Sequence, residues 1–270
     1  MKAAYANGVL SAFEDAGHRS FDAVYGTSAG GALAAWWGSG QIKQAELTWA
    51  YAADRRVLSY RRWLSARGPL LDHEFLWEVV YRDEVAFDVE ALRQCPVPIM
   101  VCASDVDDGK PVYTDLRQGQ TWLWLKATGR LPFASGLPVE IRGRRYLDGG
   151  ITDPIPVRRA VQDGHSTVTV VLNTPPGTAR RDSAAIARLT ARRYPALREG
   201  ILRHAAIKEE AIEWARSPPQ GVEIRIVRPR GPTGLHRLSR NIAAIRNGIA
   251  MGHADGRAHV ESVRLAAAAR

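Results

Sequence analysis

A serine set between two glycines is the residue of this sequence best suited to nucleophilic chemistry. Gly26-Thr27-Ser28-Ala29-Gly30 follows a short β-prone run and precedes an Ala-rich stretch typical of a helix. This Gly-x-Ser-x-Gly spacing predicts a nucleophile elbow, a sharp strand-to-helix turn that raises the serine hydroxyl above the sheet edge and aims helix amides at it. We expect both glycines to let strand and helix approach closely and the serine backbone to be strained. The alternative is a plain glycine-rich turn.

A serine nucleophile needs a base, and the sequence offers either a carboxylate or a histidine. Asp148-Gly149-Gly150 follows a predicted hairpin, and this tight turn can present the aspartate side chain without steric crowding. A histidine base would instead follow the serine, acid, histidine order of an α/β-hydrolase triad. The residues alone leave the dyad and the triad open. The histidines considered are His165, His204, His236, His253 and His259.

The elements around these residues predict an α/β fold in which strands alternate with helices. A helix over 3–17 with Gly17 as its stop precedes the elbow strand, and a second helix leaves it over 31–38. An acidic run, Asp105 to Gly109, favours a hairpin turn over a fragment of a calcium loop. The further elements that we predict are strands at 96–103 and 168–173, a hairpin over 139–147 around Gly143, and helices over 123–134 and 157–162.

The character of the chain changes after Pro176. Residues 184–214 read as helical with a break at Pro195, a strand follows at 222–227, and two more helical stretches are expected from Leu238 onward. We therefore divide the chain into residues 1–176, which contain the predicted sheet and the elbow, and residues 177–270, a mainly helical region packed on it.

Composition restricts the classes of protein to consider. The chain has 270 residues, 46% hydrophobic and 24% charged, as an ordinary globular protein has. The sequence has no run of 18 apolar residues, which would indicate a membrane span, and no leading apolar segment, which would indicate an export signal. We therefore expect a cytoplasmic protein. Cys95 and Cys102 are then expected to be reduced core residues rather than a disulfide.

The positive charge of the chain, +9 and almost all arginine, favours anionic partners such as a phospholipid surface. No zinc-ligand spacing or nucleic-acid-binding motif accompanies it, so we predict no nucleic-acid partner. The alternative is that the arginines fill ordinary solvated positions. Tryptophans and arginines alternate over 41–78, where Trp49, Trp63 and Trp77 either face lipid headgroups or fill the core.

Three blocks together resemble the patatin-like phospholipase family, in its order and spacing, over about residues 1–175. They are the elbow, Ala127-Thr128-Gly129-Arg130-Leu131-Pro132-Phe133, and Arg145-Tyr146-Leu147-Asp148-Gly149-Gly150 followed by Asp153-Pro154-Ile155-Pro156. The tail resembles that of a bacterial branch with an extra C-terminal region. The resemblance implies a three-layer fold with a mostly parallel central sheet.

The resemblance also implies a function for the elbow. Ser28 would be the nucleophile and Asp148 the general base of a dyad that cleaves lipid acyl esters through an acyl-enzyme, without a metal or another cofactor. Residues 1–176 would then be the acyl hydrolase domain. The implied partner is a lipid or acyl-ester substrate, and the positive charge described above adds peripheral contact with an anionic membrane to the expected partners. The sequence leaves the oligomeric state and the preferred headgroup and acyl chain open.

The start of the chain departs from the family pattern. The family forms its oxyanion hole from a Gly-Gly-Gly-x-Arg/Lys-Gly loop after a first strand, and here Met1-Lys2-Ala3 matches only the end of that loop. Lys2 and the amide of Ala29 are the remaining oxyanion candidates. We expect that the chain is N-terminally short and that the missing strand leaves two neighbouring strands unpaired in the middle of the sheet. The complete, longer gene product would then be the active enzyme. The rival is a catalytically weak or inactive lipid-binding protein.

Overall fold

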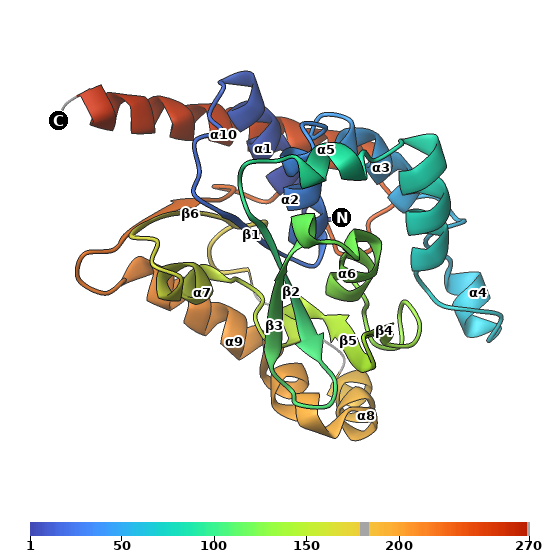
Figure 1. Cartoon of the computed structure of the whole chain (residues 1–270). Helices are drawn as coiled ribbons and strands as arrows, with labels where there is room; N and C mark the ends of the chain where they lie inside the picture. Colours follow the sequence, from blue (N-terminus) through green and yellow to red (C-terminus); the bar gives the residue numbers. More distant parts are fainter. Residues whose placement is uncertain (179–183, 269–270) are drawn as a thin grey trace.

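The computed structural model describes residues 1–178 and 184–268, and its strands lie between helices on opposite sides (Figure 1). In the view of Figure 1, α1, α2 and α10 lie above the strands, and α7 and α9 lie at the lower left, below the strand Thr167–Val171. The helices are α1 (Ala4–Asp15), α2 (Ala29–Gly38), α3 (Ala45–Ala52), α4 (Tyr60–Leu64), α5 (Val89–Arg93), α6 (Thr121–Thr128), α7 (Val157–Gln162), α8 (Ala184–Arg193), α9 (Arg198–Arg216) and α10 (Ile242–Ala268). A π-type helix, Phe75–Glu84, lies between α4 and α5.

The strands form two sheets. The larger one contains β1 (Val24–Thr27), β2 (Ile99–Asp105), β3 (Pro111–Asp115), β4 (Val139–Ile141) and β5 (Arg144–Asp148). The smaller one pairs β6 (Thr167–Val171) with β7 (Glu223–Val227) in parallel. Among the described residues, β1 and β6 each pair with a single strand.

The central strand β2 brings the ends of two other strands together. One edge of β2 pairs with β3 over residues 100–104. The other edge is shared: β1 runs parallel to it up to Thr27, opposite Cys102, and β5 runs antiparallel to it up to Asp148, opposite Ala103. The carboxyl ends of β1 and β5 therefore meet head to head at adjacent residues of β2.

The expectation of a mostly parallel central sheet is wrong. In the five-stranded sheet only β1 and β2 are parallel, and the pairs β2–β3, β2–β5 and β4–β5 are antiparallel. For two of these pairs, β2–β3 and β4–β5, the reason is the length of the connections. The turns after Asp105 and around Gly143 are a few residues long, and such turns join antiparallel strands, whereas a parallel pair needs a long crossover. Both hairpins were predicted, and the fold is α/β as expected.

The residues after 176 contribute a strand to the smaller sheet and a long helix that packs on α1. Strand β7 completes the small sheet beside β6, and α10 lies along α1 over most of the length of α1. The two helix backbones approach very closely at three glycines. A Cβ atom on Gly8 would stand 1.9 Å from the Ile249 carbonyl oxygen, and one on Gly252 would stand 2.0 Å from that of Tyr5. A Cβ atom on Gly256 would stand 2.9 Å from the Val9 carbonyl oxygen.

Several predicted elements differ in extent from those observed. The helix predicted over 123–134 ends at Thr128, since Gly129 follows it and Pro132 cannot continue a helix. The two helical stretches predicted after Leu238 are one helix, α10, in which the glycines serve the contact with α1 instead of ending the helix. The helix break at Pro195 is confirmed, because α8 and α9 are separated there.

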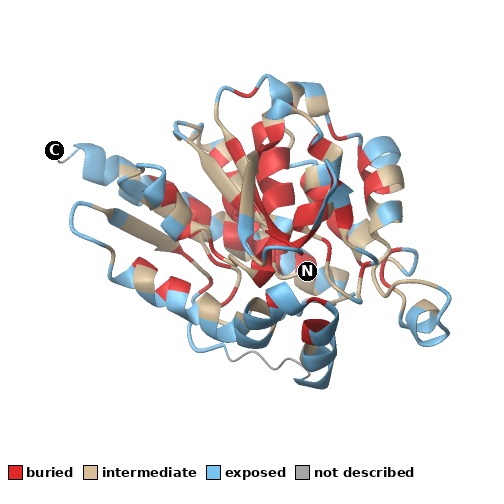
Figure 2. Cartoon of the chain, turned by 60° about the horizontal axis from the view of Figure 1, so that its bottom comes forward, coloured by how far each residue is buried: buried red, intermediate tan, exposed pale blue. Residues whose placement is uncertain are grey.

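The core lies between the helices and the larger sheet (Figure 2). Cys95 and Cys102 are buried and free, as expected. Of the three tryptophans of the 41–78 segment, Trp49 and Trp77 are core residues, as one interpretation expects, whereas Trp63 is 41% exposed. No described helix is long and apolar enough to cross a membrane.

Candidate active site

Ser28 lies at the turn between β1 and α2 with a strained backbone, at φ 57° and ψ −129°. The turn is tight on the side of Gly26, where a Cβ atom would stand 2.5 Å from the Gly30 carbonyl oxygen and 2.6 Å from the Gly31 Cα. The expectation for Gly26 is confirmed. The expectation for Gly30 is wrong, because a Cβ atom there would meet nothing within 4 Å. Gly31 is the second close position, with Val101 and Thr128 beside it.

A threonine from α6 holds the elbow in place. The Ser28 amide donates a hydrogen bond to Thr128 Oγ1 at 2.9 Å, and the Thr128 hydroxyl donates to the Cys102 carbonyl at 2.5 Å. The Thr128 hydroxyl is buried and has both a donor and an acceptor partner. The backbone of the serine is therefore tied through one side chain to the central strand β2.

The structure brings Ser28 and Asp148 into direct contact. The Ser28 hydroxyl donates a hydrogen bond to Asp148 Oδ2 at 2.6 Å, across 120 residues of sequence. The other carboxylate oxygen, Oδ1, accepts a hydrogen bond from the Gly150 amide at 2.7 Å. Asp148 is only 4% exposed. A carboxylate held by a backbone amide on one oxygen has its second oxygen directed at the hydroxyl, as a general base requires.

The backbone of Asp148 is fixed as firmly as its side chain. Its amide donates to the Arg130 carbonyl at 2.9 Å, and its carbonyl accepts from the Ser104 hydroxyl at 2.8 Å. The Ser104 hydroxyl also lies 2.8 Å from Thr152 Oγ1. The following residue, Gly149, leaves no room for a side chain, since a Cβ atom would stand 2.2 Å from the Cys102 carbonyl oxygen.

A second, partly buried carboxylate lies near the elbow. Asp153 accepts a hydrogen bond from the Tyr113 hydroxyl, and its backbone carbonyl accepts from Thr27 Oγ1 at 3.1 Å. Burial raises the pKa of Asp153, and burial also raises the pKa of Tyr113. Sequence reasoning missed Tyr113, Ser104 and Thr152, while Asp153 and Thr128 lay inside blocks quoted for the resemblance without a role.

The five candidate histidines are dispersed. His165 packs against the Tyr25 ring, His253 contacts Asp15, His259 lies by Thr169, and His236 is in the loop before α10. His204, on α9, adjoins the aspartate turn: its Nε2 lies 3.9 Å from the position of a Cβ atom on Gly150. The hydrogen bond of the Ser28 hydroxyl goes instead to the Asp148 carboxylate.

Comparison with known proteins identifies the family. A sequence model of the patatin-like phospholipase family matches residues 1–161. The chain belongs to the patatin-like phospholipase family. It is also 27% identical over 266 residues to the uncharacterized protein YjjU of Escherichia coli strain K12. That alignment covers 95% of this chain and 73% of YjjU, so the similarity continues beyond the family match. Family membership supports a lipid acyl hydrolase activity at the level of the family.

The amides that open α2 lie next to the serine of this patatin-like chain. Ala29 and Gly30 are the first two residues of α2, and the amides of a first helical turn have no partner within the helix. The amides of the next two residues are taken up by the Ser28 carbonyl. Lys2 lies in the turn before α1, where its carbonyl accepts from Tyr5. The role of Ala29 and Lys2 at an oxyanion stays a prediction.

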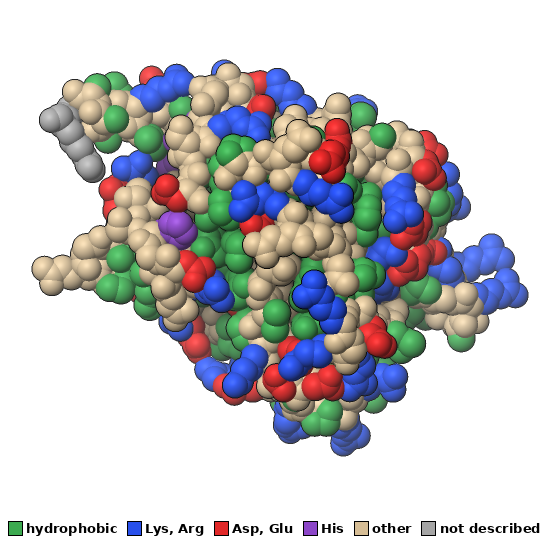
Figure 3. Space-filling model, in the orientation of Figure 1, with side chains coloured by type: hydrophobic (Ala, Val, Ile, Leu, Met, Phe, Trp, Pro, Cys, Tyr) green, Lys and Arg blue, Asp and Glu red, His purple; other side chains and the backbone are tan. Residues whose placement is uncertain are grey.

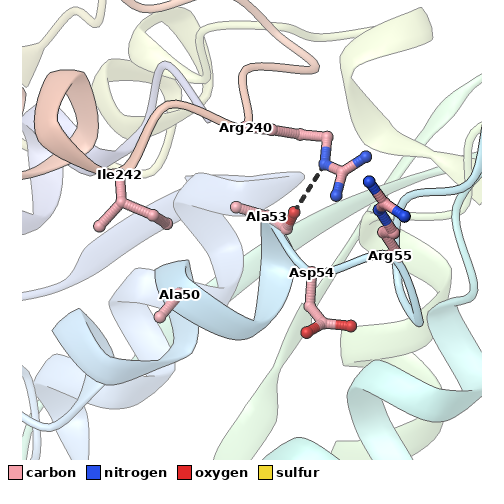
Figure 4. A pocket seen from close by; sticks show the side chains of 6 residues that line it. All are labelled: Ala50, Ala53, Asp54, Arg55, Arg240 and Ile242. Atoms are coloured by element: carbon pink, nitrogen blue, oxygen red, sulfur yellow. Dashed lines mark hydrogen bonds between the residues drawn. The ribbon is translucent and has the colours of Figure 1, made fainter.

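A surface hollow of about 630 Å³ lies away from this pair, between α3 and the start of α10 (Figure 4). The guanidinium groups of Arg55 and Arg240 lie side by side in it, and Arg240 Nε donates to the Ala53 carbonyl at 3.0 Å. Ser28 and Asp148 are not among the residues that line this hollow. Its lining residues are Ala50, Ala53, Asp54, Arg55, Arg240 and Ile242.

Proposed function

We propose that this protein is a serine acyl hydrolase of the lipase or phospholipase A type that cleaves lipid acyl esters with a Ser28/Asp148 dyad. The observation that carries the proposal is the 2.6 Å hydrogen bond from the Ser28 hydroxyl to a buried carboxylate, at an elbow with strained backbone. Membership of the patatin-like phospholipase family supports the substrate class.

The proposed reaction follows from the positions of these atoms. Asp148 Oδ2 accepts the Ser28 proton as Oγ attacks the acyl carbonyl, and the carbonyl oxygen becomes an oxyanion. The C–O bond to the alcohol then breaks, and the alcohol leaves with the proton from Asp148. Water attacks the acyl-enzyme with Asp148 again as base, which releases the fatty acid and restores the serine hydroxyl.

The start of α2 is the proposed oxyanion site. The amides of Ala29 and Gly30, which open the helix and have no carbonyl partner within it, and the positive end of the helix would stabilise the negative charge that develops on the acyl oxygen. Lys2 is the further candidate. Loss of one oxyanion donor lowers turnover by roughly 100- to 1000-fold, so an incomplete oxyanion site would leave a labelled but slow enzyme.

The test is active-site labelling of the 270-residue chain with a fluorophosphonate probe, with the labelled residue located by mass spectrometry. We expect the label on Ser28, its loss in Ser28→Ala, and at least a 100-fold slower labelling in Asp148→Asn. The matched control is Asp107→Asn, which removes an exposed carboxylate from the β2–β3 turn and should label at the wild-type rate. Hydrolysis of short- and long-chain esters then measures the acyl preference.

The rival function is a lipid-binding protein with weak or no turnover. It predicts that Ser28 is not labelled while the protein still binds vesicles. A wild-type labelling rate in Asp148→Asn would refute the dyad, even if Ser28 carries the label. A chain extended upstream, labelled in parallel, tests the expected contribution of a glycine-rich loop.

A further inference from the structure

Residues 55–71 form a projection on the side of the molecule where α4 lies (Figure 1). The segment contains five arginines and no acidic residue, although Asp54 and Asp72 flank it. Figure 3 shows Lys and Arg side chains extending outward on that side. We refer to it as the 55–71 projection.

One arginine holds the projection in a fixed shape. Arg62 donates from Nε to the Pro69 carbonyl at 2.9 Å, from Nη1 to that of Arg56 at 2.9 Å and from Nη2 to that of Val57 at 3.0 Å. The two arms of the projection are also paired at their base, where Leu58 and Leu71 form a β-bridge. The projection is therefore a built element that can present side chains in a fixed arrangement.

The tip of the projection exposes large apolar side chains. Tyr60, Trp63 and Leu64 of α4 are 47%, 41% and 76% exposed. The segment that contacts the base of the projection, through the hydrogen bond from Leu71 to Ala134, exposes two more, Phe133 and Leu137, of which Leu137 is 70% exposed. The exposure of such residues beside one another is costly in water and indicates a surface that is covered by a partner.

The arginines around this apolar tip are available for an anionic partner. Arg55, Arg61 and Arg67 are exposed, and none of them forms an ion pair with another described residue. Arg55 additionally faces the hollow that it shares with Arg240 (Figure 4). This combination of apolar side chains and arginines matches the interface of a bilayer. There the Trp63 ring and Leu64 would enter the boundary of the acyl chains, and the guanidinium groups would contact phosphates.

The projection is also linked to the proposed active site. The Leu71 amide at its base donates to the Ala134 carbonyl at 2.8 Å. The segment from Arg130 to Leu137 leads from there to the dyad, since the Arg130 carbonyl accepts from the Asp148 amide. A surface that docks on lipid at this segment would place the lipid near the residues that hold the general base.

We propose that the 55–71 projection, with Phe133 and Leu137, docks this protein on a bilayer containing anionic phospholipids. The inference rests on the proposed function only for the choice of lipid as the partner. Its test is therefore separate from catalysis. The full-length Ser28→Ala chain is sedimented with vesicles of phosphatidylcholine alone and with vesicles that contain about 30% phosphatidylglycerol, so that the two differ in surface charge.

We expect strong sedimentation with the anionic vesicles and weak sedimentation with the neutral ones. Trp63→Ala/Leu64→Ala should lower the partition coefficient at least roughly tenfold, because the apolar anchor is lost. Arg61→Glu/Arg67→Glu should lower it by a similar factor, and only for anionic vesicles. The matched controls are Leu265→Ala, at a leucine that is 67% exposed on α10, and Arg257→Glu on the same helix. Both should bind as the parent does.

Two outcomes would overturn the docking surface. In one, the tip variants bind vesicles as well as the controls do. In the other, the tip variants convert a dimer into a monomer by light scattering without changing vesicle binding, which would assign the tip to a second copy of the chain. If Ser28 labels but vesicle binding is independent of the projection, only this inference fails. If vesicles bind through the projection but Ser28 does not label, only the proposed function fails.

Discussion

The two glycines of the Gly-x-Ser-x-Gly motif should differ sharply in their tolerance of alanine. A Cβ atom at position 26 would stand 2.5 Å from the Gly30 carbonyl oxygen and 2.6 Å from the Gly31 Cα, and both are backbone atoms of the helix start. A Cβ atom at position 30 meets no atom within 4 Å. We therefore predict that Gly26→Ala disrupts the elbow and that Gly30→Ala does not.

The size of the effect follows from the distances. An ordinary contact begins at 3.4 Å, so β1 and α2 must separate in Gly26→Ala by about 1 Å, and a displacement of that size at a reacting group costs roughly 100-fold in rate. Overpacking of this kind destabilises a protein by about 1–3 kcal/mol. In Gly30→Ala, by contrast, alanine favours the helix by roughly 0.5–1 kcal/mol over glycine.

The assay compares the two variants by labelling and by thermal unfolding. The rate of fluorophosphonate labelling at Ser28 should fall roughly 100-fold in Gly26→Ala and stay within a few-fold of wild type in Gly30→Ala. The Tm should fall by a few to about ten degrees in Gly26→Ala and be unchanged or higher in Gly30→Ala. A small probe is used because the position-30 methyl group faces open space beside the serine.

Either of two results would refute this reasoning. Equal losses in the two variants would mean that the space at Gly30 is needed for something other than the approach of strand and helix. Wild-type labelling and stability in Gly26→Ala would mean that the elbow relaxes without cost, contrary to the backbone contacts described.

Three further predictions concern other parts of the molecule. His204→Ala should label within about threefold of wild type, since the proposed base is a carboxylate, and a loss near 100-fold would favour a histidine triad. Gly252→Ala should lower the Tm, because its Cβ atom would stand 2.0 Å from a carbonyl oxygen of α1, whereas Gly231→Ala, in open space, should not. Burial lowers the pKa of His73 to about 3, while the unfolded chain binds a proton near pH 6.5. The free energy of unfolding should thus decrease as pH falls from about 6.5 toward 3, by at most about 1.4 kcal/mol per pH unit, and His73→Gln should flatten this slope in urea titrations.

The candidate site could be located from sequence to the extent that it depends on local motifs. Ser28 and Asp148 each lie in a turn whose glycines are readable in sequence, and the structure brings the two side chains into hydrogen-bonding contact. Thr128 and Ser104 act through single hydroxyl groups whose partners are distant in sequence. A threonine in a helix and a serine in a strand have no pattern that indicates such a partner.

The fold shows the same division between local and distant interactions. The hairpins around Gly109 and Gly143 and the stop at Gly17 depend on positive φ angles that glycine adopts readily, and all three were predicted. The relative directions of the strands in the larger sheet were not predicted, because they depend on which strands pair with β2. The continuity of α10 was missed for a similar reason, since its glycines are explained by α1, more than 230 residues away.

The geometry of the proposed dyad depends most on a residue that has no part in its chemistry. The backbone of Cys102 lies opposite Thr27 in the sheet register, and its carbonyl accepts the hydrogen bond of the threonine that holds the Ser28 amide. The same carbonyl oxygen would lie 2.2 Å from a Cβ atom on Gly149, so the aspartate turn rests directly against it. The nucleophile and the base are thus both positioned from one peptide group of β2. A shift of that peptide would move both groups, and for this reason the short distance between them can persist although 120 residues separate them in sequence.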